Sequence, residues 1–295
     1  MLTGVFTALA TPFLPDGALD IFALRKLLAA QIKAGVHGIV LLGTTAETPA
    51  LTADEKKEII NTCINEIRKN GLQLIIGAGT NNTVSTRENL RQLYPFHPDA
   101  ALVVTPYYNK PNLSGLIGHY KAAAQEGLPL VLYHIPGRTG QKLSGAMLDT
   151  LLTEVPQIIG VKESDYDMSH VTDCAIKYTG KLSYLCGNDD LFPHFLALQS
   201  TGIISAAANV LAPGFVKIYN LFQAGKTREA FDVFAHIHPL IKACYLETNP
   251  TCIKYLLSKL QDCTPTLRAP LGPISSQTQA QLDAILAHTE KEFLI

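Results

Sequence analysis

The sequence contains no tryptophan, and only 17% of its 295 residues are charged, while 47% are hydrophobic. This composition excludes an intrinsically disordered chain and predicts a globular one. The formal net charge is −1, so the sequence also lacks the basic excess typical of proteins that bind nucleic acid or an anionic membrane. We therefore expect neither nucleic acid nor a membrane as a partner.

Long apolar runs and paired cysteines are missing as well. No stretch approaches the roughly 20 apolar residues of a membrane span. The start, Met1-Leu2-Thr3-Gly4, lacks the cationic lead of a signal peptide, so a cytoplasmic protein is expected. The six cysteines include no C-x-x-C pair, which argues against a zinc site, a redox dithiol and a disulfide scaffold.

What the sequence does contain is a regular alternation of short apolar runs with longer amphipathic segments. The short runs predict eight strands: Val5–Ala10, Gly38–Leu42, Leu74–Gly77, Ala101–Val104, Leu130–Tyr133, Ile158–Lys162, Leu182–Cys186 and Gly202–Ser205. Eight strands separated by helical crossovers predict an α/β fold, a (β/α)8 TIM barrel. An open doubly wound sheet is the alternative, but Thr11-Pro12-Phe13-Leu14 stands where such folds usually carry a glycine-rich fingerprint.

After Ser205 the strand signal stops. Four further segments predict helices: 213–224, 227–245, 249–261 and 277–290. We therefore expect a catalytic barrel over residues 1–224 and a C-terminal helical domain over residues 225–295. Thr52, followed three residues later by Glu55, predicts a capping box at the start of a helix.

Lys162 ends an apolar run that predicts a buried strand. An ammonium is costly to bury, so burial favours the free amine, which is the form that attacks a carbonyl to make a Schiff base. The alternative is a lysine just beyond the strand end, with its head in water beside Glu163.

Other candidate residues follow the predicted strands, where the working face of a parallel barrel lies. Gly43–Thr48 offers hydroxyls and backbone amides that suit a carboxylate, although a plain polar loop has the same composition. Tyr107 and Tyr108 follow the fourth strand and could simply pack at the rim. Tyr133 suits a proton donor and Arg138 a bidentate carboxylate clamp, with a surface arginine as the alternative.

No glycine-rich phosphate cradle follows the last two strands, and the acidic segment Gly187-Asn188-Asp189-Asp190 disfavours a phosphorylated substrate. Asp189 and Asp190 could bind a metal, but adjacent carboxylates more often begin a helix. We expect no metal there, because the histidines that usually support such sites are missing. His134 is expected to pack or hydrogen bond, since its side chain should point away from that of Tyr133.

These motifs together resemble the pyruvate-dependent class I aldolases of the N-acetylneuraminate lyase superfamily, and within them the dihydrodipicolinate synthase family. The match extends over nearly the whole chain. Its motifs are Ala10–Phe13, Gly43–Glu47, Val104–Pro111, Tyr133–Gly140, Gly160–Glu163, Ala208–Val210 and Asn249-Pro250. The spacing from Tyr133 to Arg138-Thr139-Gly140 favours this family over its sugar-acid relatives, which usually lack that arginine.

The resemblance implies a role for each residue. Lys162 forms the Schiff base with pyruvate, and Tyr133 donates and accepts protons in a relay with Thr44 and Tyr108, assisted by a neighbouring subunit's Tyr107. Further expected contacts come from Thr45 and the Ile204 backbone to pyruvate, and from Arg138 to the carboxylate of the second substrate.

The implied reaction condenses pyruvate with L-aspartate 4-semialdehyde to 4-hydroxy-tetrahydrodipicolinate, in lysine and diaminopimelate biosynthesis. The alternative is a sister aldolase acting on N-acetylneuraminate or 2-keto-3-deoxy sugar acids. No cofactor is expected beyond the covalent pyruvate on Lys162, and a homotetramer built as a dimer of dimers is implied. Feedback by lysine is expected to be weak, because Ala53, Lys56 and Ser85 stand where lysine-inhibited members usually carry histidines and a glutamate.

Overall fold

The computed structural model of the protein describes residues 1–295. Eight strands close into a barrel in chain order, and helices connect them, which confirms the predicted (β/α)8 TIM barrel with C-terminal helices. The strands are β1 Gly4–Ala8, β2 Gly38–Leu41, β3 Gln73–Gly77, β4 Ala100–Val104, β5 Leu130–His134, β6 Ile158–Glu163, β7 Ser183–Cys186 and β8 Gly202–Ser205. β5 and β6 each extend one residue beyond their predicted ends, to His134 and Glu163.

Contacts within the chain group it into two compact units. Unit 1 comprises Met1–Thr3 and Gln73–Ile203, and unit 2 comprises Gly4–Leu72 and Ile204–Ile295. The predicted division between residues 1–224 and 225–295 stays a prediction.

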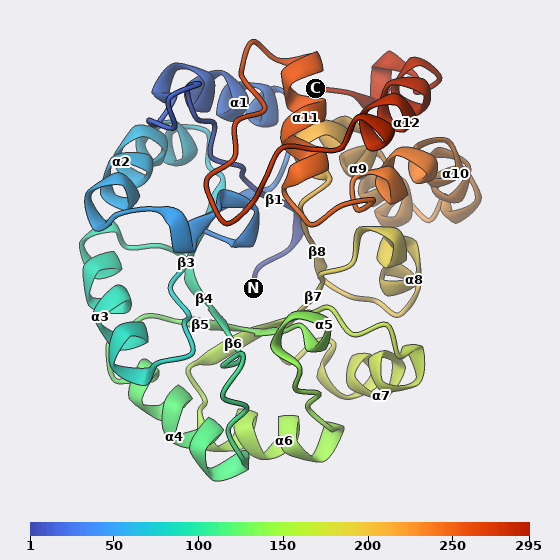
Figure 1. The fold of residues 1–295 in the computed structure, drawn as a ribbon. Helices are drawn as coiled ribbons and strands as arrows, with labels where there is room; N and C mark the ends of the chain where they lie inside the picture. Colours follow the sequence, from blue (N-terminus) through green and yellow to red (C-terminus); the bar gives the residue numbers. More distant parts are fainter. The chain divides into compact units, whose positions relative to one another are not determined.

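Unit 1 contains β3 to β7 and the helices that follow them (Figure 1). Its helices are α3 Thr83–Leu93, α4 Leu113–Ala124, α5 Pro136–Thr139, α6 Gly145–Glu154, α7 Met168–Tyr178 and α8 Phe192–Ala197, with short 3-10 turns at Tyr94–Phe96 and Asp189–Leu191. α4 packs against α3 and α6, and α6 packs against α7. In the parallel pair of β5 and β6, Tyr133 lies opposite Lys162 and His134 opposite Glu163.

Unit 2 contains the parallel pair of β1 and β2 and the C-terminal helices. Its helices are α1 Ile21–Lys33, α2 Ala53–Lys69, α9 Ala208–Gln223, α10 Thr227–Ala243, α11 Thr251–Leu260 and α12 Ser276–Ala287, with 3-10 turns at Thr44–Ala46, Thr48–Ala50 and Lys291–Phe293. α10 packs against α9 and α12 (Figure 1). The predicted capping box is confirmed, because the Thr52 side chain and Glu55 each accept the other's backbone N–H.

One helix start was predicted too late. α9 begins at Ala208 and not at residue 213, because two helical segments join across a kink at Leu211, whose φ of −118° is non-helical. Pro213 lies just after this kink, where a proline's missing N–H is tolerated as at a helix start.

The core follows from the periodicity of each element. All five residues of β5 are buried, as expected for a parallel strand covered on both faces. On α2 the buried side chains recur with helical spacing, at Ile59, Ile60, Cys63, Ile64 and Ile67.

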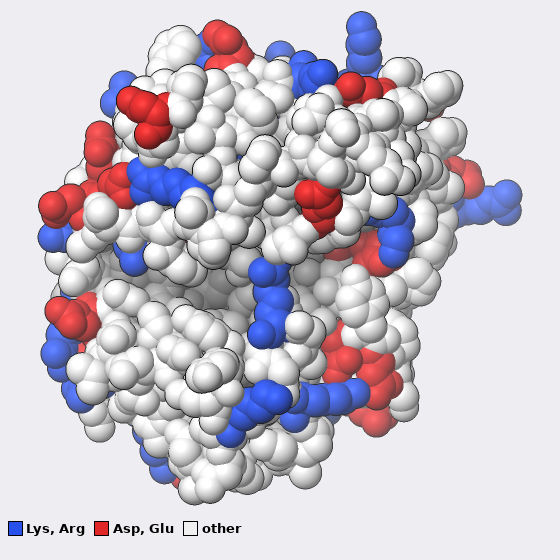
Figure 2. All heavy atoms as spheres, in the orientation of Figure 1, with Lys and Arg blue, Asp and Glu red and all other residues white.

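None of the helices is both long and apolar enough to qualify as a membrane span. On the face drawn in Figure 2, acidic and basic side chains are interspersed among larger uncharged areas.

Candidate active site

The predicted nucleophile, Lys162, lies buried on β6 with only 7% of its surface exposed. Its Nζ is 4.2 Å from the centre of the Tyr133 ring, and Tyr133 is equally buried. The contact arises because the two residues are register partners on neighbouring parallel strands, so their side chains lie on the same face of the sheet. The alternative of a solvated lysine beside Glu163 is wrong, since Glu163 is fully buried and pairs with other side chains.

Gly187 follows β7 and leaves room for the Lys162 side chain, because glycine has no side chain of its own. A Cβ at this position would lie 3.1 Å from the Lys162 Cε, 2.9 Å from the Glu163 carbonyl oxygen and 2.0 Å from the Ser164 Oγ. Real Cβ atoms essentially never lie within 3.0 Å of another atom, so a larger residue here would displace Ser164 or the backbone of the strand that carries the lysine. The sequence analysis missed this role, because a glycine in a loop reads first as a turn residue.

Arg138 lies in the short helix α5, directly after β5, and its side chain is exposed. The loop around it is well anchored. Thr139 Oγ1 donates to the Ile135 carbonyl at 3.0 Å, and Gln141 Nε2 donates to the Pro111 carbonyl at 2.6 Å. Gly140 ends the helix in the left-handed region with φ +68°, which glycine adopts without strain. Arg138 therefore extends from a loop that several hydrogen bonds hold in place.

Tyr107 and Tyr108 follow β4 and are exposed, 37% and 89% respectively. Tyr108 adopts φ +71°, an unusual value for a side chain of this size. The turn is fixed by Asn109, whose backbone N–H donates to the Tyr107 carbonyl at 2.9 Å and whose side chain donates to the Asn81 carbonyl at 2.8 Å. Such exposure leaves both rings accessible to a substrate or to another protein chain.

In unit 2, Thr44 and Thr45 form the 3-10 turn that follows β2. Thr44 is exposed, whereas Thr45 is buried and its Oγ1 accepts a hydrogen bond from Asn249 Nδ2 at 3.0 Å. Ile204 is fully buried in β8. The structure thus brings Lys162 and Tyr133 into contact within unit 1, and anchors the threonine turn to the start of the C-terminal helices within unit 2.

A buried ion pair also holds the threonine turn. Glu47 ends this turn in the left-handed conformation, with φ 54°. Its carboxylate lies 2.6 Å from the Nζ of Lys254 on α11, and both side chains are only 2% exposed. The backbone N–H of Arg268 donates to the same carboxylate at 2.8 Å. The sequence analysis missed this arrangement, because nothing local marks partners 207 residues apart.

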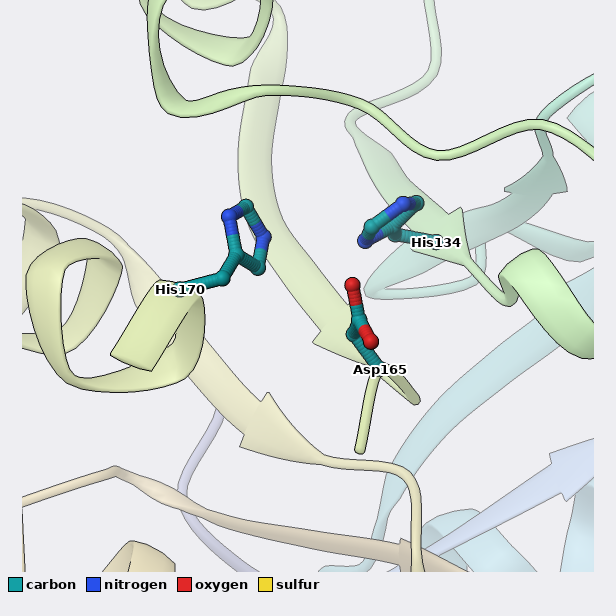
Figure 3. A group of neighbouring side chains, drawn as sticks. All are labelled: His134, Asp165 and His170. Carbon is teal, nitrogen blue, oxygen red and sulfur yellow. The ribbon is translucent and has the colours of Figure 1, made fainter. Parts of the chain in front are cut away.

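One group of side chains in unit 1 could in principle hold a metal ion. His134, Asp165 and His170 face one another, with one potential ligand atom of each within 4.8 Å of the others (Figure 3). The backbone N–H of Leu143 donates to His134 Nε2 at 3.0 Å, so the ring proton of His134 lies on Nδ1, where it donates to Glu163 at 2.8 Å. Both ring nitrogens of His134 are therefore occupied.

The other two members of this group fit a metal no better. Contacts with the Cys174 sulfur and the Glu163 carboxylate raise the pKa of His170 to about 10, so this ring is an imidazolium without a free lone pair at neutral pH. Asp165 forms an ion pair with Lys142 at 3.1 Å. The donor set fits an internal charge network and does not fit a metal site. Asp189 and Asp190 begin a 3-10 helix, as their adjacency suggested.

Comparison with known proteins shows which family the chain resembles. Residues 1–289 match the Dihydrodipicolinate synthetase family. A relative from Brucella abortus named 4-hydroxy-tetrahydrodipicolinate synthase is 37% identical over 289 residues, which cover 98% of each chain. The solved dihydrodipicolinate synthase from Thermotoga maritima is 31% identical, with a TM-score of 0.94 over 98% of this chain and 99% of that one.

A second similar solved structure contains a bound ligand. The chloride-inhibited dihydrodipicolinate synthase from Acinetobacter baumannii, complexed with pyruvate, is 32% identical, with a TM-score of 0.93 over 98% of this chain and 99% of that one. The resemblance inferred from the sequence motifs is therefore confirmed, and the chain belongs to the Dihydrodipicolinate synthetase family.

Proposed function

We propose that this chain condenses pyruvate with L-aspartate 4-semialdehyde to form 4-hydroxy-tetrahydrodipicolinate, in lysine and diaminopimelate biosynthesis. The chain is a lyase, as its family and its near full-length relatives are. The observation that carries the proposal is the buried amine of Lys162 held against the ring of Tyr133. The sugar-acid alternative is not favoured, because the relative from Brucella abortus bears the synthase name over almost its entire length.

Lys162 supplies the electron sink of this reaction. Its free amine attacks the keto carbon of pyruvate, and loss of water leaves an iminium ion. The iminium accepts the electron pair released when the pyruvate methyl group loses a proton, which produces an enamine. The enamine carbon attacks the aldehyde of the second substrate. The amino group of that substrate then displaces Lys162 and closes the ring, so the scheme calls for no metal or organic cofactor.

The remaining residues position the substrates and move protons. The Tyr133 ring packs against the Lys162 amine, and we assign the Tyr133 hydroxyl to proton exchange with the bound intermediate. We assign the rest of the relay to Thr44 and to Tyr108, with the partner subunit's Tyr107 assisting. Thr45 and the Ile204 backbone are assigned to pyruvate. Arg138 is assigned to the semialdehyde carboxylate, which its planar guanidinium can grip with two hydrogen bonds.

We further propose a homotetramer assembled from two tight dimers, with the exposed Tyr107 and Tyr108 at the dimer contact. Burial of these rings against a second chain would remove apolar surface from water and stabilise the pair. Sedimentation velocity of the unchanged chain should give a tetramer. A monomer at micromolar concentration would contradict this assembly and leave the assignment of Lys162 unaffected.

Reductive trapping tests the central claim. Borohydride added with pyruvate should leave a carboxyethyl group on the Lys162 peptide, and none without pyruvate. Lys162→Arg keeps the charge but cannot form the adduct, so it should abolish both trapping and turnover. Lys121→Ala, a control at an exposed lysine of unit 1, should change neither.

A coupled assay then identifies the reaction. The semialdehyde should be consumed together with pyruvate, and N-acetylneuraminate should not be cleaved at a comparable rate. An adduct without semialdehyde turnover would overturn the proposed reaction while keeping the Schiff-base class.

A further inference from the structure

A polar network lies directly behind the proposed catalytic pair. His134 and Glu163 are register partners one residue beyond Tyr133 and Lys162. Because side chains alternate along a strand, they lie on the opposite face of the sheet from that pair. Both are fully buried, on the side where α7 contributes His170. The proposed reaction does not use either of them directly.

Glu163 is the centre of this network. Its Oε1 accepts a hydrogen bond from His134 Nδ1 at 2.8 Å and another from the backbone N–H of Asp165 at 2.8 Å. Its Oε2 forms an ion pair with His170 Nε2 at 3.4 Å. Burial by itself would favour the neutral acid, but these partners hold the pKa of Glu163 below its usual value. A buried carboxylate oxygen that accepts two hydrogen bonds fixes the positions of both donors, His134 and the Asp165 backbone.

The network also reaches the loop that carries Arg138. His134 Nε2 accepts the backbone N–H of Leu143 at 3.0 Å, in the segment between α5 and α6. The backbone of Glu163 contributes as well, since its carbonyl accepts the N–H of Gly187 at 2.7 Å. The Glu163 carboxylate therefore joins the ends of β5 and β6, while the Glu163 carbonyl binds Gly187 and the His134 ring binds the base of the arginine loop.

We propose that Glu163 is a positioning residue, whose hydrogen bonds to His134 and to the Asp165 backbone hold the ends of β5 and β6 so that Tyr133 stays against the Lys162 amine. This inference rests on the proposed function, since it concerns the same two residues. Proton transfer depends steeply on separation, and a displacement of about 1 Å at a reacting group can cost on the order of a hundredfold in rate. Glu163 touches no substrate in this scheme and acts only through its neighbours.

The test compares a variant that keeps the hydrogen bonds with one that removes them. Glu163→Gln retains an acceptor for His134 and Asp165, whereas Glu163→Ala retains none. We expect Glu163→Ala to lower kcat about a hundredfold, with the KM for each substrate changed less than about threefold, and to slow trapping of pyruvate on Lys162. Glu163→Gln should stay within about fivefold of the unchanged chain. Glu126→Gln, at an ion-paired carboxylate elsewhere in unit 1, is the control and should have no effect.

A second pair keeps the inference testable if Glu163→Ala does not fold. His134→Asn preserves a donor towards Glu163, and His134→Leu removes it, so the first should be the more active. Equal kcat for folded Glu163→Ala and the unchanged chain would overturn the proposal, as would an equal loss in Glu163→Gln and Glu163→Ala. Absence of trapping and turnover in the unchanged chain would instead overturn the proposed function, and the positioning role with it.

Discussion

At the residue scale, the chemistry depends on which way a side chain points. Lys162 and Glu163 are adjacent in the chain, yet the first lies against Tyr133 and the second against His134 on the other face of the sheet. The sequence analysis correctly expected His134 to hydrogen bond away from Tyr133. The alternative that it left open, a solvated strand end with Lys162 beside Glu163, is wrong because Glu163 is fully buried.

The space at Gly187 leads to a prediction. Gly187→Ala should lower the free energy of unfolding by about 1–3 kcal/mol, the usual cost of overpacking, and should reduce turnover more than an equally destabilised variant elsewhere. The reason is that the added methyl group meets Ser164, the Glu163 carbonyl and Lys162 itself. Chemical denaturation and steady-state kinetics measure the two effects. Gly145→Ala, where a Cβ meets nothing within 4 Å, is the matched control, and a similar result for both variants would contradict this account.

At the element scale, the threonine turn after β2 depends on helix α11, which lies far away in the sequence. The Lys254–Glu47 ion pair and the Asn249 hydrogen bond to Thr45 both originate at this helix or just before it. A non-glycine residue in the left-handed conformation, as Glu47 is, needs such external contacts to stay there. The C-terminal helices of unit 2 therefore have a defined role in shaping this turn.

Removing one partner of this buried pair should be costly. Lys254→Met leaves the Glu47 carboxylate buried without its ammonium, and we expect a loss of about 3–5 kcal/mol in the free energy of unfolding. The double variant with Lys254→Met and Glu47→Gln should recover part of this loss, because it no longer buries an unpaired carboxylate at position 47. Lys259→Met, at an exposed lysine of the same helix, is the control in urea denaturation. A loss under about 1 kcal/mol for Lys254→Met would show that the pair is not important for stability.

The network around Glu163 predicts a pH dependence of stability. The pKa of His170 is about 10 in the folded protein, above its ordinary value of 6.5, owing to Cys174 and Glu163. A raised pKa means that the folded state binds the proton more tightly. The stabilisation that protonated His170 contributes is therefore complete below pH 6.5 and is lost as the pH rises from 6.5 through 10. The free energy of unfolding should fall across this window by at most about 1.4 kcal/mol per pH unit from this group.

The variant His170→Gln identifies the source of that slope. Denaturation curves at pH 6 to 9.5 in the presence of a reductant should show a shallower decline for His170→Gln than for the unchanged chain, because other groups titrate in both. Identical slopes would mean that His170 does not bind an extra proton in the folded protein.

At the scale of the whole molecule, the sequence analysis predicts that lysine regulates this chain only weakly. Lys56 lies on α2, and the resemblance places it where lysine-inhibited members usually carry histidines and a glutamate. Repulsion between this ammonium and that of the ligand costs about 1 kcal/mol or more, which is roughly a fivefold or greater loss of affinity. Millimolar lysine should therefore inhibit turnover only weakly. Lys56→Gln should increase the inhibition, while Lys57→Gln, at the exposed neighbouring position, should not. Strong inhibition of the unchanged chain at micromolar lysine would refute this prediction.

Alternating apolar and amphipathic segments determined the eight strands and the barrel, because burial on both faces of a parallel sheet leaves a local pattern in the sequence. The family was inferred separately, from the resemblance of the sequence motifs to those of a known family. The same reasoning selected Lys162, Tyr133 and Arg138 from their places at strand ends. Only the tertiary structure decided that Tyr133 lies against Lys162, that Gly187 makes room for the lysine, and that Glu163 and Lys254 lie in buried charge networks. A buried charge is tolerated only when it has partners, and those partners come from distant segments that no local pattern can identify.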